Sequence, residues 1–174
     1  MILVDPDLDP DPPSLALQTK RMSSADLRLT DRDRRLPSAR TLTRFLREAQ
    51  AAVRLRGDVS VLLTTDQTIR RLNRQFRHIN KATDVLSFPA PGVAAAEVAG
   101  DLAISVPMAL RQARAQGHGL AVEIKVLILH GLLHLAGFDH EVDNGRMARR
   151  ERLLRGRLGL PQGLIERAKT RVAL

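Results

Sequence analysis

The 174-residue chain contains no cysteine, no tryptophan and no tyrosine, and it has only four phenylalanines. Without cysteine it forms no disulfide and offers no thiolate to a metal, which is compatible with a reducing compartment. So few aromatic rings argue against a platform on which nucleic-acid bases stack. The sequence also lacks an apolar run of membrane-spanning length. Aspartates and prolines directly follow the apolar residues 2–4, and this pattern differs from that of a secretory signal. We therefore expect a soluble, cytoplasmic protein with no membrane partner.

Basic residues, in contrast, are abundant. The chain has 28 Lys and Arg against 19 Asp and Glu, a formal net charge of +9. A basic surface favours a polyanionic partner, most often nucleic acid, although a coding bias toward arginine would give the same excess. The arginines around 70–77 and 146–157 could line a groove for single-stranded RNA. Since aromatic residues are scarce, such a groove would contact phosphates, and its affinity would fall steeply with salt.

Residues 1–36 are expected to form a flexible N-terminal tail. Aspartate and proline dominate residues 5–13, and neither favours a regular helix or strand there. Residues 37–174 are expected to form one domain, because this length suffices for a proper core.

Within the domain, helical and strand patterns alternate without a regular βαβ rhythm. A helix is predicted from Ser38, stopped by Gly57, and a second one begins at Thr65 or Asp66. Strands are predicted at 58–65, 83–89 and 100–106, and further helices at 107–117, 120–136 and after residue 140. The predicted core faces include Leu42, Phe45, Leu46, Ala49 and Val53 in the first helix; Ile69, Leu72 and Phe76 in the second; and Met147, Leu153 and Leu154 in the last. The fold class is α+β, with a small mixed sheet packed with helices.

Three of the five histidines lie in the stretch from His130 to His140. His130 and His134 are four residues apart, so on a helix their imidazoles lie on one face. The surrounding residues are apolar nearly all round, which predicts a buried central helix. Gly137 can adopt the left-handed conformation that ends a helix, and the reversal could return His140 to the same point.

This pattern predicts a metal site at His130, His134 and His140. Histidines on an apolar helix are often ordinary core residues, but the third histidine after a glycine turn favours a shared ion. Three nitrogen ligands leave a fourth tetrahedral position open, as in catalytic zinc sites. We expect one Zn²⁺ per chain, although nickel and cobalt would bind the same ligands.

The same spacing occurs in the metzincin peptidase pattern H-E-x-x-H-x-x-G-x-x-H. Those peptidases carry a general-base glutamate directly after the first histidine, and this chain has Gly131 there. A metallopeptidase is therefore a weaker hypothesis than another metal-dependent hydrolase.

Three stretches together resemble the YbeY endoribonuclease family, also called the rRNA maturation factor family. They are residues 72–77 leading to 83–89, residues 100–105, and the histidine stretch 130–140. The resemblance implies a zincin-like α+β fold and a single-strand-specific, metal-dependent endoribonuclease. It also implies a role in 3′-end maturation of 16S rRNA and in ribosome quality control, with the small ribosomal subunit as a partner.

By position, the resemblance makes His130, His134 and His140 the zinc ligands and Arg77 the functional arginine. Zinc would lower the pKa of a bound water or act as a Lewis acid, and Arg77 would hold the scissile phosphate. Asp139 could orient a histidine or accept a proton, or it could simply cap a turn. A non-enzymatic alternative is a ribosome-assembly factor with a structural metal, which would require a fourth protein ligand.

Overall fold

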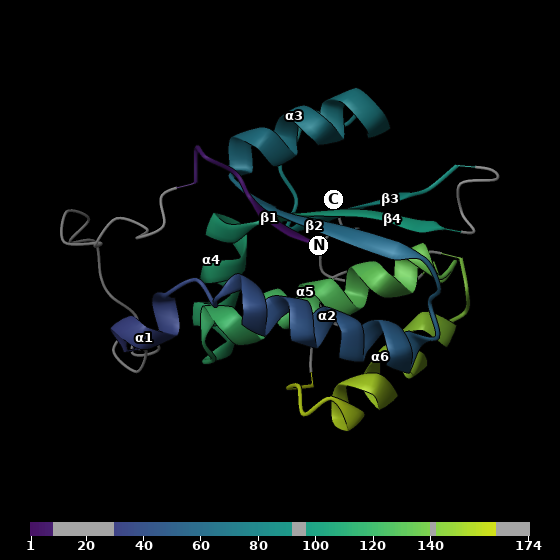
Figure 1. The fold of residues 1–174 in the computed structure, drawn as a ribbon. Helices are drawn as coiled ribbons and strands as arrows, with labels where there is room; N and C mark the ends of the chain where they lie inside the picture. The colour runs from purple at the N-terminus through teal and green to yellow at the C-terminus, as the bar shows by residue number, and fades with distance from the viewer. Residues whose placement is uncertain (9–29, 92–96, 140–141, 163–174) are drawn as a thin grey trace.

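The computed structural model describes residues 1–8, 30–91, 97–139 and 142–162. Within these ranges the chain forms a four-stranded sheet and six helices (Figure 1). In chain order the elements are β1 (Ile2–Val4), α1 (Asp31–Arg34), α2 (Ala39–Val53), β2 (Asp58–Thr64), α3 (Asp66–Arg77), β3 (Val85–Pro89), β4 (Val98–Ser105), α4 (Val106–Gln116), α5 (Leu120–Leu135) and α6 (Arg146–Arg157).

The sheet is mixed, with strand order β1-β2-β4-β3. β1 and β4 both run parallel to the central strand β2, whereas β3 pairs antiparallel with β4 and forms one edge. The register places Leu62 opposite Ala103, and Val85 opposite Ile104. These features confirm the predicted α+β class with a small mixed sheet.

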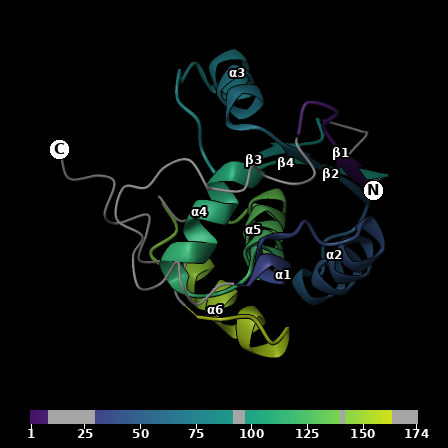
Figure 2. The same cartoon turned by 90° about the vertical axis from the view of Figure 1, so that its left-hand side faces the viewer.

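The two faces of the sheet carry different helices (Figures 1 and 2). Because strand side chains alternate between faces, Val61 and Ile104 point into the main core with α2 and α5. Ala103 and Leu86 point the other way, into a smaller cluster with Ile69 of α3. The sheet therefore separates α3 from α5, and this separation decides where the candidate functional residues lie.

Side-chain caps define the starts of three helices, and the cap at Thr65 was predicted from the sequence. Ser38, Thr65 and Ser105 each accept a hydrogen bond from the backbone N–H three residues ahead. The predicted end of α2 is wrong, because Arg54 in the left-handed conformation ends the helix before Gly57. Gly57 has a different role: at φ +90° it lies where a Cβ would come within 2.8 Å of the Ala99 nitrogen.

The first residues of the chain depart from the expected flexible tail. Residues 2–4 form β1, and the Asp5 carboxylate accepts hydrogen bonds from the hydroxyls of Thr64 and Thr68. Leu8 is buried in the main core. A three-residue strand is too short to show a period, so its pairing with β2 depends on a tertiary contact. Residues 9–29 of the predicted tail lie outside the described residues.

Two predicted core residues are exposed. Phe76 lies on the solvent side of the last turn of α3, 57% exposed, with its ring edge against Phe88 at a centroid distance of 5.2 Å. Leu153 on α6 is 61% exposed, whereas its neighbour Leu154 is fully buried. Leu153 and Leu154 are adjacent, so they cannot both face the core, whereas Phe76 has the spacing of a core residue and only the tertiary packing leaves it exposed.

None of the described helices alone is long and apolar enough to cross a membrane. α4 and α5 meet the criteria of length and composition only as a pair, and the chain bends by 111° between them.

Candidate active site

A pair of histidines lies on the last two turns of α5. The helix is buried on nearly all sides, as predicted, but both imidazoles are only partly buried. The Nε2 atoms of His130 and His134 are 3.2 Å apart, and the rings meet edge to face at 74°. The spacing of four residues thus brings two ring nitrogens to one point at the end of a rigid element.

Helix α6 supplies the residue that orients this pair. Nδ1 of His130 lies 3.0 Å from the Oε2 atom of Glu151. The other carboxylate oxygen of Glu151 accepts hydrogen bonds from Nε and Nη2 of Arg155, the first at 2.9 Å. A further nitrogen of Arg155 donates to the Pro161 carbonyl at 3.1 Å. Glu151 and Arg155 are 1% and 2% exposed, so this ion pair belongs to the interior.

The Glu151 carboxylate is held in its charged form. Burial alone would raise its pKa, but the hydrogen bond from His130 and then the charge and hydrogen bonds of Arg155 lower the pKa below its ordinary value. An ionised carboxylate accepts only, so Nδ1 of His130 carries the donated proton. In a neutral imidazole this leaves a lone pair on Nε2, the atom that faces His134.

Sequence reasoning missed Glu151 and Arg155, although a signal was present. Met147, Glu151, Leu154 and Arg155 follow the i, i+4, i+7, i+8 spacing of a buried helix face. Charged residues on such a face need partners, and Glu151 with Arg155 is an i, i+4 pair of opposite charge. Its third member, His130, is 21 residues away, and only the packing of α6 on α5 reveals it.

Gly131 is explained by packing against the sheet. A Cβ at this position would come within 2.7 Å of Cδ2 of Leu102, a side chain of β4 that is itself 1% exposed. The neighbouring strand β3 contributes Ser87, whose hydroxyl donates a long hydrogen bond of 3.4 Å to the Gly131 carbonyl. A glutamate, the general base of the peptidase pattern, has no room at this position without displacing the buried leucine.

The chain turns after α5 as the sequence predicts. Gly137 has φ +84°, and the Phe138 N–H donates to the Leu133 carbonyl. The Asp139 carbonyl then accepts from the N–H groups of Val142 and Asp143, which leads the chain toward α6. His140 lies outside the described residues. Within the ranges that the structure describes, no group of three or more potential ligand side chains is close enough to hold a metal.

The two described histidines fit a shared ion. Zinc–nitrogen bonds are about 2.0–2.1 Å long, so two nitrogens at a tetrahedral zinc are separated by roughly 3.3 Å. The observed separation of the Nε2 atoms is 3.2 Å. A carboxylate on the opposite ring nitrogen is also the usual partner of a metal-binding histidine.

The two predicted catalytic residues are placed differently. Asp139 is exposed on the turn that follows α5, close in sequence to the histidine pair. Arg77 is exposed at the end of α3, on the other face of the sheet (Figure 1). α3 and α5 run toward the same end of the sheet but lie on its opposite faces. The described residues thus bring His130 and His134 together but leave Arg77 apart from them.

By its fold and site, the chain is a small α+β protein whose buried helix presents a histidine pair oriented by an interior carboxylate. The family model described as "Endoribonuclease YbeY" matches residues 27–159. Proteins named Endoribonuclease YbeY from Solibacter usitatus and Koribacter versatilis are 51% and 52% identical, over 74% and 75% of this chain and 85% and 84% of their own lengths. A solution structure of a Thermotoga maritima protein aligns with a TM-score of 0.49 and 26% identity, over 71% of this chain and 85% of that one.

The chain belongs to the YbeY endoribonuclease family. The prediction of a hydrolase that acts on RNA is thereby confirmed.

Proposed function

We propose that the chain is a single-strand-specific endoribonuclease that matures the 3′ end of 16S rRNA in the cytoplasm and contributes to ribosome quality control. The observation that carries the proposal is the histidine pair, with Nε2 atoms 3.2 Å apart and one ring anchored by a buried carboxylate. His130, His134 and His140 would hold one Zn²⁺. When bound, zinc would supply a Lewis acid for a phosphoryl oxygen and lower the pKa of water.

The residues around the pair have separate roles in this proposal. Glu151 accepts a hydrogen bond from Nδ1–H of His130 and so keeps Nε2 available as a ligand. The positive charge of Arg155 stabilises the ionised form of Glu151, so the buried carboxylate does not become protonated. Arg77 binds the RNA backbone through its forked guanidinium, and Asp139 accepts a proton or orients the third histidine.

The arrangement favours an enzyme over a protein with a purely structural metal. Structural zinc sites are closed by four protein ligands, which usually include cysteine, and this chain has no cysteine. His130 and His134 are only partly buried at the end of α5, as a site that must admit a substrate requires. The close packing of Gly131 on Leu102 also weakens the metallopeptidase alternative.

The decisive experiment measures cleavage of single-stranded and duplex rRNA fragments together with metal content. Wild type should cut only single strands, and His134→Ala should lose both metal and cleavage. Arg77→Ala should keep the metal and lose cleavage, while Arg47→Ala, an exposed arginine of α2, should retain both. Equal cleavage by all four preparations would identify a contaminating nuclease and refute the proposal.

A chelator separates the enzyme from the assembly factor. Removal of a catalytic ion should abolish cleavage and leave the circular dichroism spectrum unchanged. Unfolding on chelation would instead favour a structural metal.

A further inference from the structure

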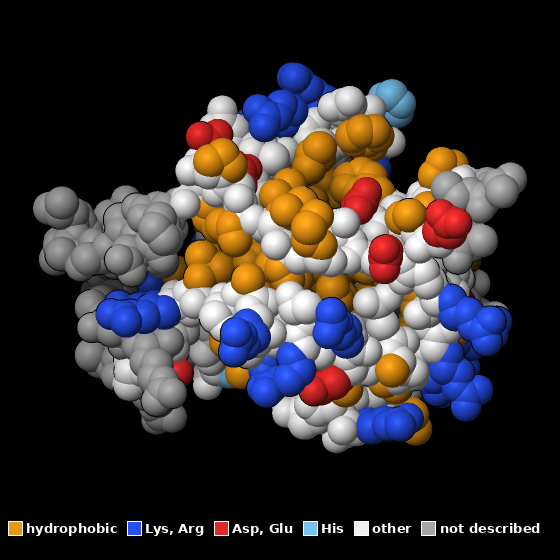
Figure 3. Space-filling view, viewed as in Figure 1, with side chains coloured by type: hydrophobic (Ala, Val, Ile, Leu, Met, Phe, Trp, Pro, Cys, Tyr) orange, Lys and Arg blue, Asp and Glu red, His pale blue; other side chains and the backbone are white. Residues whose placement is uncertain are grey.

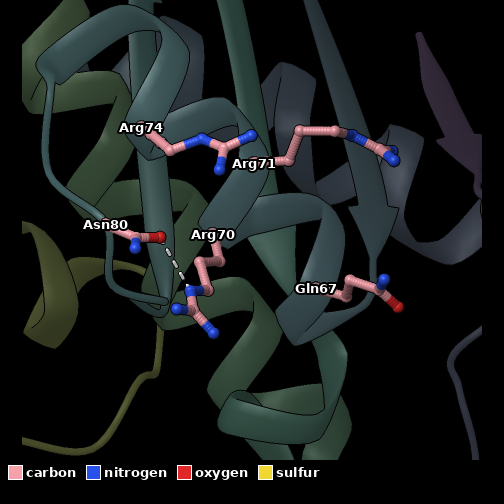
Figure 4. Close-up of a pocket in the computed structure, with 5 residues that line it drawn as sticks. All are labelled: Gln67, Arg70, Arg71, Arg74 and Asn80. Carbon is pink, nitrogen blue, oxygen red and sulfur yellow. Dashed lines mark hydrogen bonds between the residues drawn. The ribbon is translucent and has the colours of Figure 1, made fainter.

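Helix α3 carries an arginine surface on the side of the sheet away from the histidine pair. Gln67, Arg70, Arg71, Arg74 and Asn80 line a hollow of about 230 Å³ (Figure 4). That volume is below the range of pockets for drug-sized ligands, so it suits a phosphate group better than a whole nucleotide. The three arginines are exposed, and Figure 3 shows basic side chains gathered over α3.

The charges of this surface are not balanced by carboxylates. The ion pairs among the described residues use other arginines, namely Arg111 with Asp66 and Arg155 with Glu151. The partners that hold the α3 arginines are neutral: Asn80 Oδ1 accepts from Arg70 at 2.9 Å, and a threonine hydroxyl accepts from Arg71 at 3.3 Å. Asp5 acts on Arg71 electrostatically, but its carboxylate accepts hydrogen bonds from two threonines.

The positions of these arginines lower the stability of α3 as a helix. Arg70 and Arg74 are four residues apart and Arg71 and Arg74 are three apart, so like charges repel along one helix face. Neutral side chains accept the hydrogen bonds that Arg70 and Arg71 donate, so each guanidinium keeps further N–H groups for an anion (Figure 4). Such a surface is suited to a polyanion whose phosphates accept from several guanidiniums.

The arginines of α3 are also aligned along the helix axis. Arg70, Arg74 and Arg77 follow the i, i+4, i+7 spacing of one helix face, which leads toward the end of the sheet where α5 also ends (Figure 1). A helix on each face places the two sites about 20 Å apart, two layers of about 10 Å each. At about 3.4 Å per nucleotide, the spacing along a stacked strand, on the order of six nucleotides cover this distance.

We propose that Arg70, Arg71 and Arg74 form a phosphate-binding surface, on the opposite face of the sheet from the histidine pair, that binds one part of the RNA strand. From this surface the strand passes around the β3 edge and past Arg77 to reach the histidines. This inference rests on the proposed function, because it assumes that RNA is the substrate. It makes the enzyme select for strand length: long single strands engage both faces of the sheet, and very short ones only the histidine side.

The test compares an Arg70→Gln/Arg71→Gln/Arg74→Gln variant with Arg40→Gln/Arg44→Gln/Arg47→Gln. The second variant removes three exposed arginines at i, i+4, i+7 of α2, so both lose the same charge. Binding of an uncleavable 2′-O-methyl RNA of about 12 nucleotides, long enough for both sites, is measured by fluorescence anisotropy over a salt series. Circular dichroism checks the fold, and Arg74→Gln alone, which breaks no hydrogen bond to the described residues, provides a milder variant.

Removing three phosphate contacts from a single strand should reduce the slope of log K against log salt by about 2 and weaken binding on the order of 100-fold at 0.1 M salt. The α2 variant should keep the wild-type slope. Equal losses in both variants would show a general effect of net charge and overturn the proposal. An unchanged slope in the α3 variant would also overturn it and point to an acidic protein as the partner.

Cleavage assays distinguish this proposal from the proposed function. The α3 variant should cut a trinucleotide as well as wild type does and lose activity only on long strands, since about three nucleotides cannot span both sites. Equal loss on both lengths would refute the surface. If wild type cleaves neither RNA, the proposed function fails, and the anisotropy result still decides whether the surface binds RNA.

Discussion

Glu151→Gln tests the network that orients the histidine pair. The substitution keeps the shape of the side chain and removes its charge, which leaves Arg155, 2% exposed, without a counter-charge in the interior. Loss of one member of a buried pair costs about 3–5 kcal/mol of unfolding free energy. Because glutamine still accepts a hydrogen bond from Arg155, we expect about 3 kcal/mol, equivalent to a fall in Tm of roughly 10 °C in a chain of this size.

Urea unfolding and zinc titration measure the two consequences separately. Loss of the carboxylate partner of a ligating histidine should weaken zinc binding by about 10- to 100-fold. Glu48→Gln, on the exposed surface of α2, is the matched control and should change neither quantity.

The acid side of the stability profile gives a second test. The pKa of Glu151 is lowered in the folded state from an ordinary value of 4.5, since the bonds from His130 and Arg155 outweigh desolvation. Its stabilisation is therefore fully present above about pH 4.5 and is lost as pH falls through the lower, folded pKa. Glu151→Gln should flatten the pH dependence of unfolding below pH 4.5, and Glu48→Gln should not.

A double-mutant cycle tests whether Glu151 and Arg155 act as a buried pair. In Glu151→Gln/Arg155→Met no unpaired charge remains, so the double variant should be more stable than the sum of the single effects by about 1–3 kcal/mol. Effects that add to within about 0.5 kcal/mol would mean that the two residues do not act as a buried pair.

Two further predictions concern packing. Gly131→Ala should lower the free energy of unfolding in urea by about 1–3 kcal/mol, because the new methyl meets the buried Leu102. The control Gly156→Ala in α6, where a Cβ meets no atom nearer than 3.8 Å, should leave the protein equally or more stable. Equal losses in the two variants would contradict this account. Ile69→Ala should cost about 2–5 kcal/mol since Ile69 is fully buried, whereas Phe76→Ala, at a 57% exposed position, should cost less than about 1.5 kcal/mol. A larger loss for Phe76→Ala would mean that the ring is buried in solution.

Local features of the site could be predicted from the sequence. The four-residue spacing of His130 and His134, the apolar run around them and the glycine turn at Gly137 all depend on neighbours within a few residues. The same is true of the caps Ser38, Thr65 and Ser105, whose side chains bond the backbone three residues ahead. A helix ending in two aligned imidazoles was therefore predictable from the sequence alone.

Contacts between distant elements were decided by the tertiary structure. The pairing of β1 with β2, 59 residues away in the Ile2–Val61 register, has no local signal, because a backbone ladder accepts any short extended segment. The contact of His130 with Glu151 depends on how α6 packs against α5. The exposure of Phe76 depends on how the end of α3 packs against Phe88 of β3. Periodicity shows that a face is buried, and only packing shows which partner that face meets.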